Sequence, residues 1–188
     1  MHPGPAEREQ VSRGGEKLAF GLEAFQLSPR GWVTCDLGAQ VGGFVRSLLQ
    51  RGARRVYAVD TAYGVLAWEL RNDPRVVVLE RTNALYVTLP EPVDLVTIDV
   101  GWTRQARILP HALTLLASGG QVLSLLKPQY EATPKERRRG VVRPECWQEV
   151  VARTLRGLEE LGLPVRALAP LPHPTPGGNR EVFLLLRP

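Results

Sequence analysis

The stretch from Trp32 to Phe44 constrains the fold of this chain more than any other. A short apolar run ends at Asp36, small residues follow it, and an apolar helical pattern then begins. This order predicts a strand, a glycine-rich turn and a helix. Gly38 and Gly42 have no side chain, so the backbone can approach a ligand closely there. The turn follows the carboxyl end of its strand, where open α/β sheets bind ligands.

The remaining sequence alternates short apolar runs with helical patterns. Strands are expected at 32–36, 55–60, 75–79, 93–99 and 121–126, and helices at 17–27, 42–51, 64–71, 104–117 and 144–161. Residues 131–143 are expected to form a charged loop. Segments 164–168 and 181–186 predict two further strands, whose proline- and glycine-rich connection is too short for a helical crossover.

These elements predict an α/β fold with a mostly parallel seven-stranded sheet, a C-terminal antiparallel hairpin and helices on both faces. The terminal hairpin favours the class I methyltransferase variant of the Rossmann architecture over the dehydrogenase variant. We expect residues 1–11 to be a flexible leader and residues 12–188 to form one domain.

Composition narrows the possible locations and partners. No apolar run approaches the roughly 20 residues that span a bilayer, and the polar start has no signal-peptide core, so we expect a cytoplasmic protein. The two cysteines are far apart and make neither a disulfide framework nor a zinc signature, and the three histidines lack metal-ligand spacing. The net charge of +5 suits a polyanionic partner.

The glycine turn argues against a dinucleotide. The dinucleotide pattern Gly-x-Gly-x-x-Gly requires a second glycine at position 40, which is Gln40 here, so a pyrophosphate would lack its close backbone approach. S-adenosylmethionine has no phosphate and makes no such demand. Asp60 ends the next strand and can accept hydrogen bonds from both hydroxyls of a ribose. Asn83 can bond an adenine edge, although a turn-forming role is equally consistent with its spacing.

Four charged residues lie at or near the same predicted rim. Asp99 and Lys127 close neighbouring strands, Lys17 lies on the helix before the first strand, and Glu181 starts the last strand. Only three lysines occur in this arginine-rich chain. Surface salt bridges are one interpretation of these residues. Proton abstraction from a hydroxyl is the other, since burial and a neighbouring cation can turn a lysine into a base.

Several motifs, in this order, resemble the TlyA branch of the FtsJ-like methyltransferases. They are Ser12-Arg13-Gly14-Gly15-Glu16-Lys17-Leu18, the turn from Asp36 to Phe44, Val56-Tyr57-Ala58-Val59-Asp60, Glu80-Arg81-Thr82-Asn83-Ala84, Lys127-Pro128-Gln129-Tyr130-Glu131, Gly140-Val141-Val142-Arg143 and Gly178-Asn179-Arg180-Glu181. The resemblance implies S-adenosylmethionine-dependent methylation of a cytidine ribose 2′-hydroxyl in rRNA. It also implies a small N-terminal RNA-binding domain, which we expect to be missing because only eleven residues precede Ser12.

By the same resemblance, the family's Lys-Asp-Lys-Glu catalytic tetrad falls on Lys17, Asp99, Lys127 and Glu181. The residues implied for the methyl-donor site are Asp36, Gly38, Gly42, Phe44, Asp60, Asn83 and Asp99. The chain departs from the family pattern at Gly101, where a serine is usual, and at Gln40-Val41, which replace a small Ser-Thr pair.

Basic residues beside Lys127 suggest contacts with RNA phosphates, which position RNA without reading its sequence. They are Lys135, Arg137, Arg138, Arg139 and Arg143, to which Arg13 can be added. Trp102 and Tyr130 can stack a splayed base, although core or rim packing is the favoured role for each.

Two other functions stay open from the sequence alone, and a third is disfavoured. A methyltransferase for a small molecule or a protein would not need RNA affinity. A non-enzymatic RNA- or ribosome-binding module would not need the methyl donor. Membrane lysis, suggested by the haemolysin names of some family members, lacks an amphipathic or spanning segment here. The oligomeric state is not indicated.

Overall fold

The computed structural model describes residues 12–163 and 165–188. The predicted leader, 1–11, and Pro164, where a strand was expected to begin, lie outside the described residues. The strands of the main sheet are β1 (Val33–Leu37), β2 (Arg55–Val59), β3 (Val76–Leu79), β4 (Val93–Ile98), β5 (Leu116–Leu126), β8 (Val165–Pro170) and β9 (Val182–Leu186). The α-helices are α1 (Arg13–Ala24), α2 (Gly43–Gln50), α3 (Trp68–Arg71), α4 (Gln105–Thr114), α5 (Pro128–Glu131) and α6 (Pro144–Glu160).

The main sheet has seven strands in the order β3-β2-β1-β4-β5-β9-β8. The first five are mutually parallel, and β9 runs antiparallel to both of its neighbours. The predicted mostly parallel sheet and C-terminal antiparallel hairpin are therefore confirmed. The strand order reverses between β1 and β4, which is the position where open α/β sheets bind ligands.

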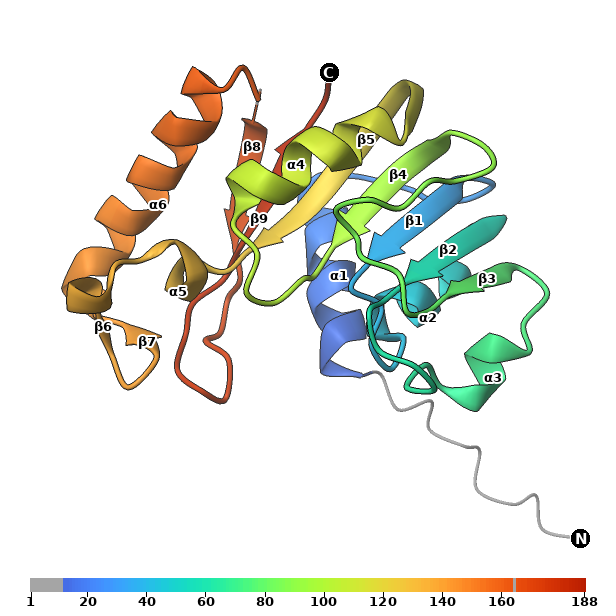
Figure 1. Ribbon diagram of the computed structural model, residues 1–188, viewed down its shortest axis with the longest axis horizontal. Helices are drawn as coiled ribbons and strands as arrows, with labels where there is room; N and C mark the ends of the chain where they lie inside the picture. Colours follow the sequence, from blue (N-terminus) through green and yellow to red (C-terminus); the bar gives the residue numbers. More distant parts are fainter. Residues whose placement is uncertain (1–11, 164) are drawn as a thin grey trace, which may run out of the picture.

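Helices cover both faces of the sheet, as predicted (Figure 1). Alternate side chains of each central strand point to opposite faces, so the strands are apolar on both sides and two cores form. On one face, α1 and α2 bury Leu22 and Leu48 against the sheet. On the other face, α4 and α6 bury Ile108 and Leu158.

One end of the molecule gathers the segments that matter for function. Figure 1 shows four features at the same end: the carboxyl ends of the parallel strands, the start of α1, a short hairpin and the β8–β9 connection. The hairpin consists of β6 (Arg137–Arg138) and β7 (Val141–Val142). Helix α1 begins at Arg13, four residues before the predicted start, because the Ser12 hydroxyl accepts a hydrogen bond from the Gly15 amide (3.1 Å) and caps it.

Other element boundaries also differ from the prediction, two of them by several residues. The helix expected at 64–71 is reduced to the four residues of α3, because the carboxylates of Asp60 and Glu80 accept hydrogen bonds from the Ala62 and Gly64 amides and hold that stretch in turns. Strand β5 begins at Leu116 instead of residue 121, through an irregularity in its pairing with β4.

The expected charged loop at 131–143 is instead an ordered structure. It contains a 3₁₀ turn (Pro134–Glu136) and a short hairpin formed by β6 (Arg137–Arg138) and β7 (Val141–Val142). Arg139 and Gly140 make the turn with φ of 51° and 81°. This two-residue turn with positive φ at both positions is typical of tight hairpins. An arginine at its first position hides the usual Asn-Gly signature.

Candidate active site

Lys127 and Asp99 form an ion pair where β4 and β5 end. The Lys127 Nζ lies 2.6 Å from the Asp99 Oδ1, and both side chains are mostly buried. This buried oxygen has a cation beside it, and no group in the part of the chain that the structure describes donates a hydrogen bond to it. It can therefore accept a hydrogen bond from another group.

Lys17 and Glu181 form a second pair. The Lys17 Nζ donates a hydrogen bond to the Glu181 Oε2 over 2.6 Å, and only 3% of Glu181 is exposed. Helix α1 supplies the lysine, and the residue before β9 supplies the carboxylate. An almost fully buried carboxylate needs such a partner, because burying a charge alone is costly.

The register of the sheet brings the two pairs together. Leu126 of β5 lies opposite Val182 of β9, so continuing this antiparallel register by one residue sets Lys127 opposite Glu181. Neither pair is an isolated surface salt bridge, since each has a partly buried lysine. Asp99, Lys127 and Glu181 thus lie at adjoining strand ends, and Lys17 joins them from α1 through its hydrogen bond to Glu181.

A cavity of about 510 Å³ opens beside Asp99. This volume suits a cofactor-sized ligand. Four of the residues predicted for the donor site line it: Gly38, Asp60, Asn83 and Asp99. A larger hollow of about 710 Å³ lies between α6 and β8, away from the carboxyl ends of the central strands, so size alone does not identify the site.

Asp60 shapes the floor of the cavity. Its Oδ2 accepts a hydrogen bond from the Gln40 amide (2.8 Å), and its Oδ1 accepts one from the Ala62 amide (2.8 Å). Each carboxylate oxygen has a further lone pair for a ligand hydroxyl. Asn83 makes the turn that its alternative interpretation predicted, since its Oδ1 accepts a hydrogen bond from the Leu85 amide (2.9 Å).

Three predicted donor-site residues do not line this cavity. Phe44 is buried at the start of α2, with its ring centroid 6.2 Å from that of Phe183. Gly42 is the N-cap of α2. Asp36 is fully buried in β1, where its Oδ1 accepts a hydrogen bond from the Thr97 hydroxyl (2.8 Å) and its Oδ2 has no partner among the described residues.

Burial dominates the ionisation of Asp36. It raises the pKa of this carboxyl to about 8, and the nearby charges of Asp99 and Asp60 act in the same direction, against the Thr97 hydrogen bond. Asp36 is therefore largely protonated at neutral pH. Its neutral carboxyl supports the wall between β1 and β4 without adding a full negative charge to the site.

The turn glycines are required by protein contacts as well as by ligand access. A Cβ on Gly38 would lie 2.8 Å from the Asp99 carbonyl oxygen, and Gly38 has a φ of 94°. A Cβ on Gly43 would lie 2.7 Å from the Ser12 hydroxyl. The turn is thus packed against both the end of β4 and the start of α1.

Sequence reasoning missed the apolar part of the cavity wall, which Val65, Leu85 and Ile108 supply. Gln40 and Trp102, which the sequence had singled out, also line the cavity, with left-handed backbones (φ 47° and 61°). The available signal was position, because these residues lie in segments that follow strand ends. Trp102 is 87% exposed, and its ring centroid is 5.0 Å from that of Tyr130.

The predicted RNA-contacting residues divide into two groups. Lys135, Arg137, Arg138, Arg139 and Arg143 line one groove of about 640 Å³ on the β6–β7 hairpin. Arg13 lies elsewhere, in a groove of about 380 Å³ that it shares with Lys17 and the β8–β9 connection. Within the described ranges, there is no group of three or more His, Cys, Asp or Glu side chains that could hold a metal ion.

The strand order, the antiparallel β9 and the cavity at the switch point define the S-adenosylmethionine-dependent methyltransferase fold. A fibrillarin from Aeropyrum pernix with natively bound S-adenosylmethionine has this fold: its TM-score is 0.65 at 23% identity, covering 90% of this chain and 74% of that one. A hemolysin-named structure from Streptococcus thermophilus matches with a TM-score of 0.87 at 36% identity, over 94% of this chain and 66% of that one.

The sequence comparisons identify the family. The model for the FtsJ-like methyltransferases matches residues 10–187, so the chain belongs to that family. It is 43% identical over 188 residues to the 16S/23S rRNA (cytidine-2′-O)-methyltransferase TlyA of Mycobacterium tuberculosis, covering 97% of this chain and 70% of that protein. The branch predicted from the motifs is thus confirmed. No helix in the described part of the chain is long and apolar enough to cross a membrane.

Proposed function

We propose that this protein transfers a methyl group from S-adenosylmethionine to the 2′-hydroxyl of a cytidine ribose in rRNA. It acts in the cytoplasm, with residues 12–188 as the catalytic domain. The observation that carries the proposal is the convergence of two lysine–carboxylate pairs, Lys127–Asp99 and Lys17–Glu181, beside a cofactor-sized cavity. Similarity to the mycobacterial TlyA supports the choice of rRNA and of cytidine.

The cavity fits S-adenosylmethionine by its chemistry. Asp60 offers carboxylate oxygens to a ribose, and Leu85 and Ile108 offer an apolar wall to an adenine. The carboxylates of Asp60 and Asp99 favour a cationic ligand and disfavour a phosphate. When bound, this donor supplies an electrophilic methyl group on a sulfonium. Asp99 lies between the cavity and Lys127 and can serve both.

The two lysine–carboxylate pairs have different roles at the acceptor hydroxyl. Lys127, in its neutral amine form, would take the proton of the ribose hydroxyl while the hydroxyl oxygen gained the methyl group and the bond from that methyl group to the donor sulfur broke. Asp99 orients Lys127 through their ion pair. Lys17 holds the hydroxyl in place, and Glu181 anchors Lys17 through their 2.6 Å hydrogen bond. A pair of lysines is needed because one must accept a proton while the other keeps its charge.

RNA would approach along the basic end of the molecule. The hairpin residues Arg138 and Arg139 are exposed, and their side chains form no ion pair or hydrogen bond with the residues that the structure describes. They are suited to phosphate contacts. Arg13 provides a second cation beside Lys17. The exposed ring of Trp102, backed by Tyr130, is a stacking surface for an unpaired base next to the cavity.

The test is to map ribose methylation in rRNA from cells with and without the gene. We expect one or a few cytidine 2′-O-methyl groups to disappear in the deletion strain and to return when the gene is restored. Restoration with a Lys127→Ala variant should fail. Identical methylation maps in both strains would contradict an rRNA target.

A further inference from the structure

Asn179 joins the basic hairpin to the strand that carries Glu181. Its side chain contacts the hairpin twice: the Oδ1 accepts a hydrogen bond from the Val142 amide (3.1 Å), and the Nδ2 donates one to the Gly140 carbonyl (3.2 Å). Glu181 follows two residues later in the chain. An asparagine that satisfies two backbone groups at once fixes both the position and the orientation of the hairpin.

The connection around Asn179 is itself rigid. The Thr175 amide donates to the Asn179 carbonyl (2.8 Å), and the Asn179 amide donates to the Thr175 hydroxyl (3.2 Å). The Trp147 indole on α6 donates to the Arg180 carbonyl (3.2 Å). The backbone from Asn179 to Arg180 is thus tied to Thr175 and to α6.

The hairpin also reaches the other lysine–carboxylate pair. The Arg137 guanidinium donates a hydrogen bond to the Gln129 carbonyl (3.1 Å), two residues after Lys127. The hairpin thus contacts the backbone beside both lysine–carboxylate pairs: through Arg137 near Lys127 and through Asn179 near Glu181.

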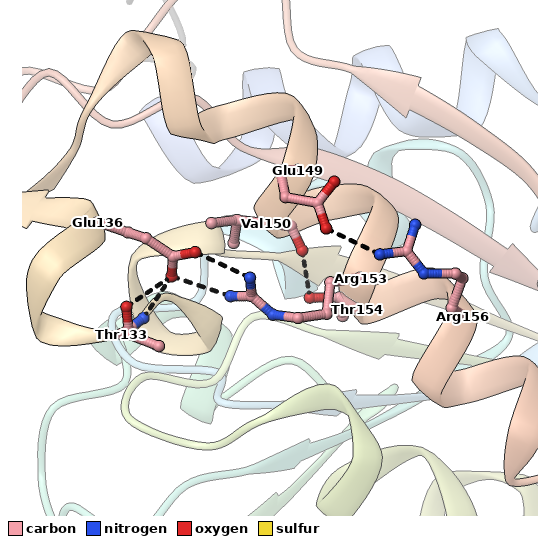
Figure 2. A network of polar contacts seen from close by, with 7 residues as sticks. All are labelled: Thr133, Glu136, Glu149, Val150, Arg153, Thr154 and Arg156. Carbon is pink, nitrogen blue, oxygen red and sulfur yellow. Dashed lines mark hydrogen bonds and ion pairs between the residues drawn. The ribbon is translucent and has the colours of Figure 1, made fainter.

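An ion pair between Glu136, just before the hairpin, and Arg153 on α6 ties the two elements together (Figure 2). The two carboxylate oxygens of Glu136 accept hydrogen bonds from both terminal nitrogens of Arg153 on α6 (2.8 and 2.9 Å) and from the Thr133 amide (2.7 Å). These contacts, with Arg153 first, lower the pKa of Glu136 to about 2. This ion pair therefore persists near neutral pH and ties the start of the hairpin to α6.

We propose that the β6–β7 hairpin positions the tetrad when it binds the RNA backbone, with Asn179 as the positioning residue that links the two. This inference rests on the proposed function. Phosphate contacts at Arg138 and Arg139 hold the hairpin, Asn179 passes its position to Glu181, and Glu181 sets the place of Lys17. Asn179 touches neither the donor nor the ribose, so it acts through Glu181.

The experiment is a double-mutant cycle on the full chain, with Asn179→Ala, Arg138→Ala and their combination. Methyl transfer from labelled S-adenosylmethionine is measured on ribosomal subunits from a strain lacking the gene, giving kcat and KM, and donor affinity is measured by calorimetry. Asn179→Ala should lower kcat about tenfold, the effect of two ordinary hydrogen bonds, without changing donor affinity. Asn179→Ala should lower kcat by a smaller factor in the Arg138→Ala background, because in that background RNA no longer holds the hairpin through Arg138.

Two further variants separate positioning from folding. Asn179→Asp keeps the acceptor for the Val142 amide but loses the donor to Gly140, so its kcat should fall between those of wild type and Asn179→Ala. Asn72→Ala removes an exposed asparagine on the Trp68 carbonyl of α3 and should behave as wild type. A kcat of Asn179→Ala equal to that of this control would overturn the proposal, as would effects of the two substitutions that simply multiply.

A second measurement distinguishes failure of this link from failure of the proposed function. In hydrogen–deuterium exchange with polycytidylate, wild type should gain protection at residues 171–181, and Asn179→Ala should not. A wild type that leaves rRNA unmethylated contradicts the proposed function, and the exchange result still decides the link. Equal protection in both proteins, or none in wild type, overturns it.

Discussion

Lys127 is the residue on which the chemistry depends most directly. Its Nζ lies 2.6 Å from the Asp99 Oδ1, and its side chain is only 14% exposed. Its replacement by arginine keeps the charge and the approximate size. Arginine cannot give up its proton at a usable pH, however. The pair of substitutions Lys127→Ala and Lys127→Arg therefore separates a base from a mere cation.

Both Lys127→Ala and Lys127→Arg should reduce methyl transfer by about 10²–10⁴-fold, the usual contribution of general acid–base catalysis. Affinity for S-adenosylmethionine should be unchanged, because the donor cavity remains intact. Single-turnover transfer to rRNA and calorimetry measure the two quantities. An arginine variant as fast as wild type would show that Lys127 acts only through its charge.

The raised pKa of Asp36 leads to a prediction about how stability depends on pH. Its pKa is raised from 3.8 to about 8 in the folded protein, chiefly by burial. Between these values the folded state keeps a proton that the unfolded chain has lost, so the free energy of unfolding falls as pH rises, by at most about 1.4 kcal/mol per pH unit. Below pH 3.8 both states are protonated, and above pH 8 both are ionised.

The Asp36→Asn variant removes this titration while keeping the acceptor for the Thr97 hydroxyl. Relative to the variant, wild type should lose stability as pH is raised from 4 to 8. Urea unfolding followed by tryptophan fluorescence at several pH values measures the difference. A difference that is constant over this range would mean that Asp36 is ionised in the folded protein.

At the scale of elements, the β1–α2 turn is packed closely against the end of β4. Gly38 and Gly119 both have left-handed backbones, with φ of 94° and 77°. A Cβ on Gly38 would lie 2.8 Å from the Asp99 carbonyl, whereas one on Gly119 meets nothing within 4 Å. The two glycines are therefore a matched pair that separates backbone strain from steric contact.

Gly119→Ala should cost about 1–2 kcal/mol of unfolding free energy, from the backbone alone. Gly38→Ala should cost about 1–3 kcal/mol more, because the strand end that carries Asp99 must move. It should also weaken donor binding, whereas Gly119→Ala should not. Chemical unfolding and calorimetry check both expectations. Equal costs for the two variants would mean that the turn absorbs the methyl group without moving Asp99.

The elements that sequence could predict are those whose pattern is local. The strands of the parallel sheet are continuous apolar runs, and the tetrad residues follow or precede such runs, so Asp99 and Lys127 could be assigned to one rim in advance. The β6–β7 hairpin could not, because its turn uses Arg139-Gly140 and its position depends on distant residues such as Asn179. The shortening of α3 likewise depends on hydrogen bonds to Asp60 and Glu80.

At the scale of the whole molecule, charge is distributed unevenly about the sheet. The net charge is +5, and the basic hairpin lies at the end where the parallel strands finish (Figure 1). Arg30 and Arg54 are equally exposed but precede β1 and β2, at the opposite end of the strands. The two arginine pairs differ in place but not in chemistry, so they test whether location determines RNA binding.

Replacing Arg138 and Arg139 with alanine should weaken RNA binding and make it less sensitive to salt. Each phosphate contact to single-stranded RNA contributes about 0.7 to the slope of log K against log salt, so the slope should flatten by about 1.4. Arg30→Ala with Arg54→Ala should leave it unchanged. Fluorescence anisotropy with polycytidylate at several salt concentrations gives both slopes. Equal flattening by the two pairs would contradict a localised RNA surface.

The central claim is that this site methylates a ribose oxygen. The most direct measurement is mass spectrometry of nucleosides from unmethylated rRNA treated with the purified protein and isotope-labelled S-adenosylmethionine. We expect labelled 2′-O-methylcytidine with wild type and none with Lys127→Ala. Label on a base, or equal 2′-O-methylation by the two proteins, would contradict it.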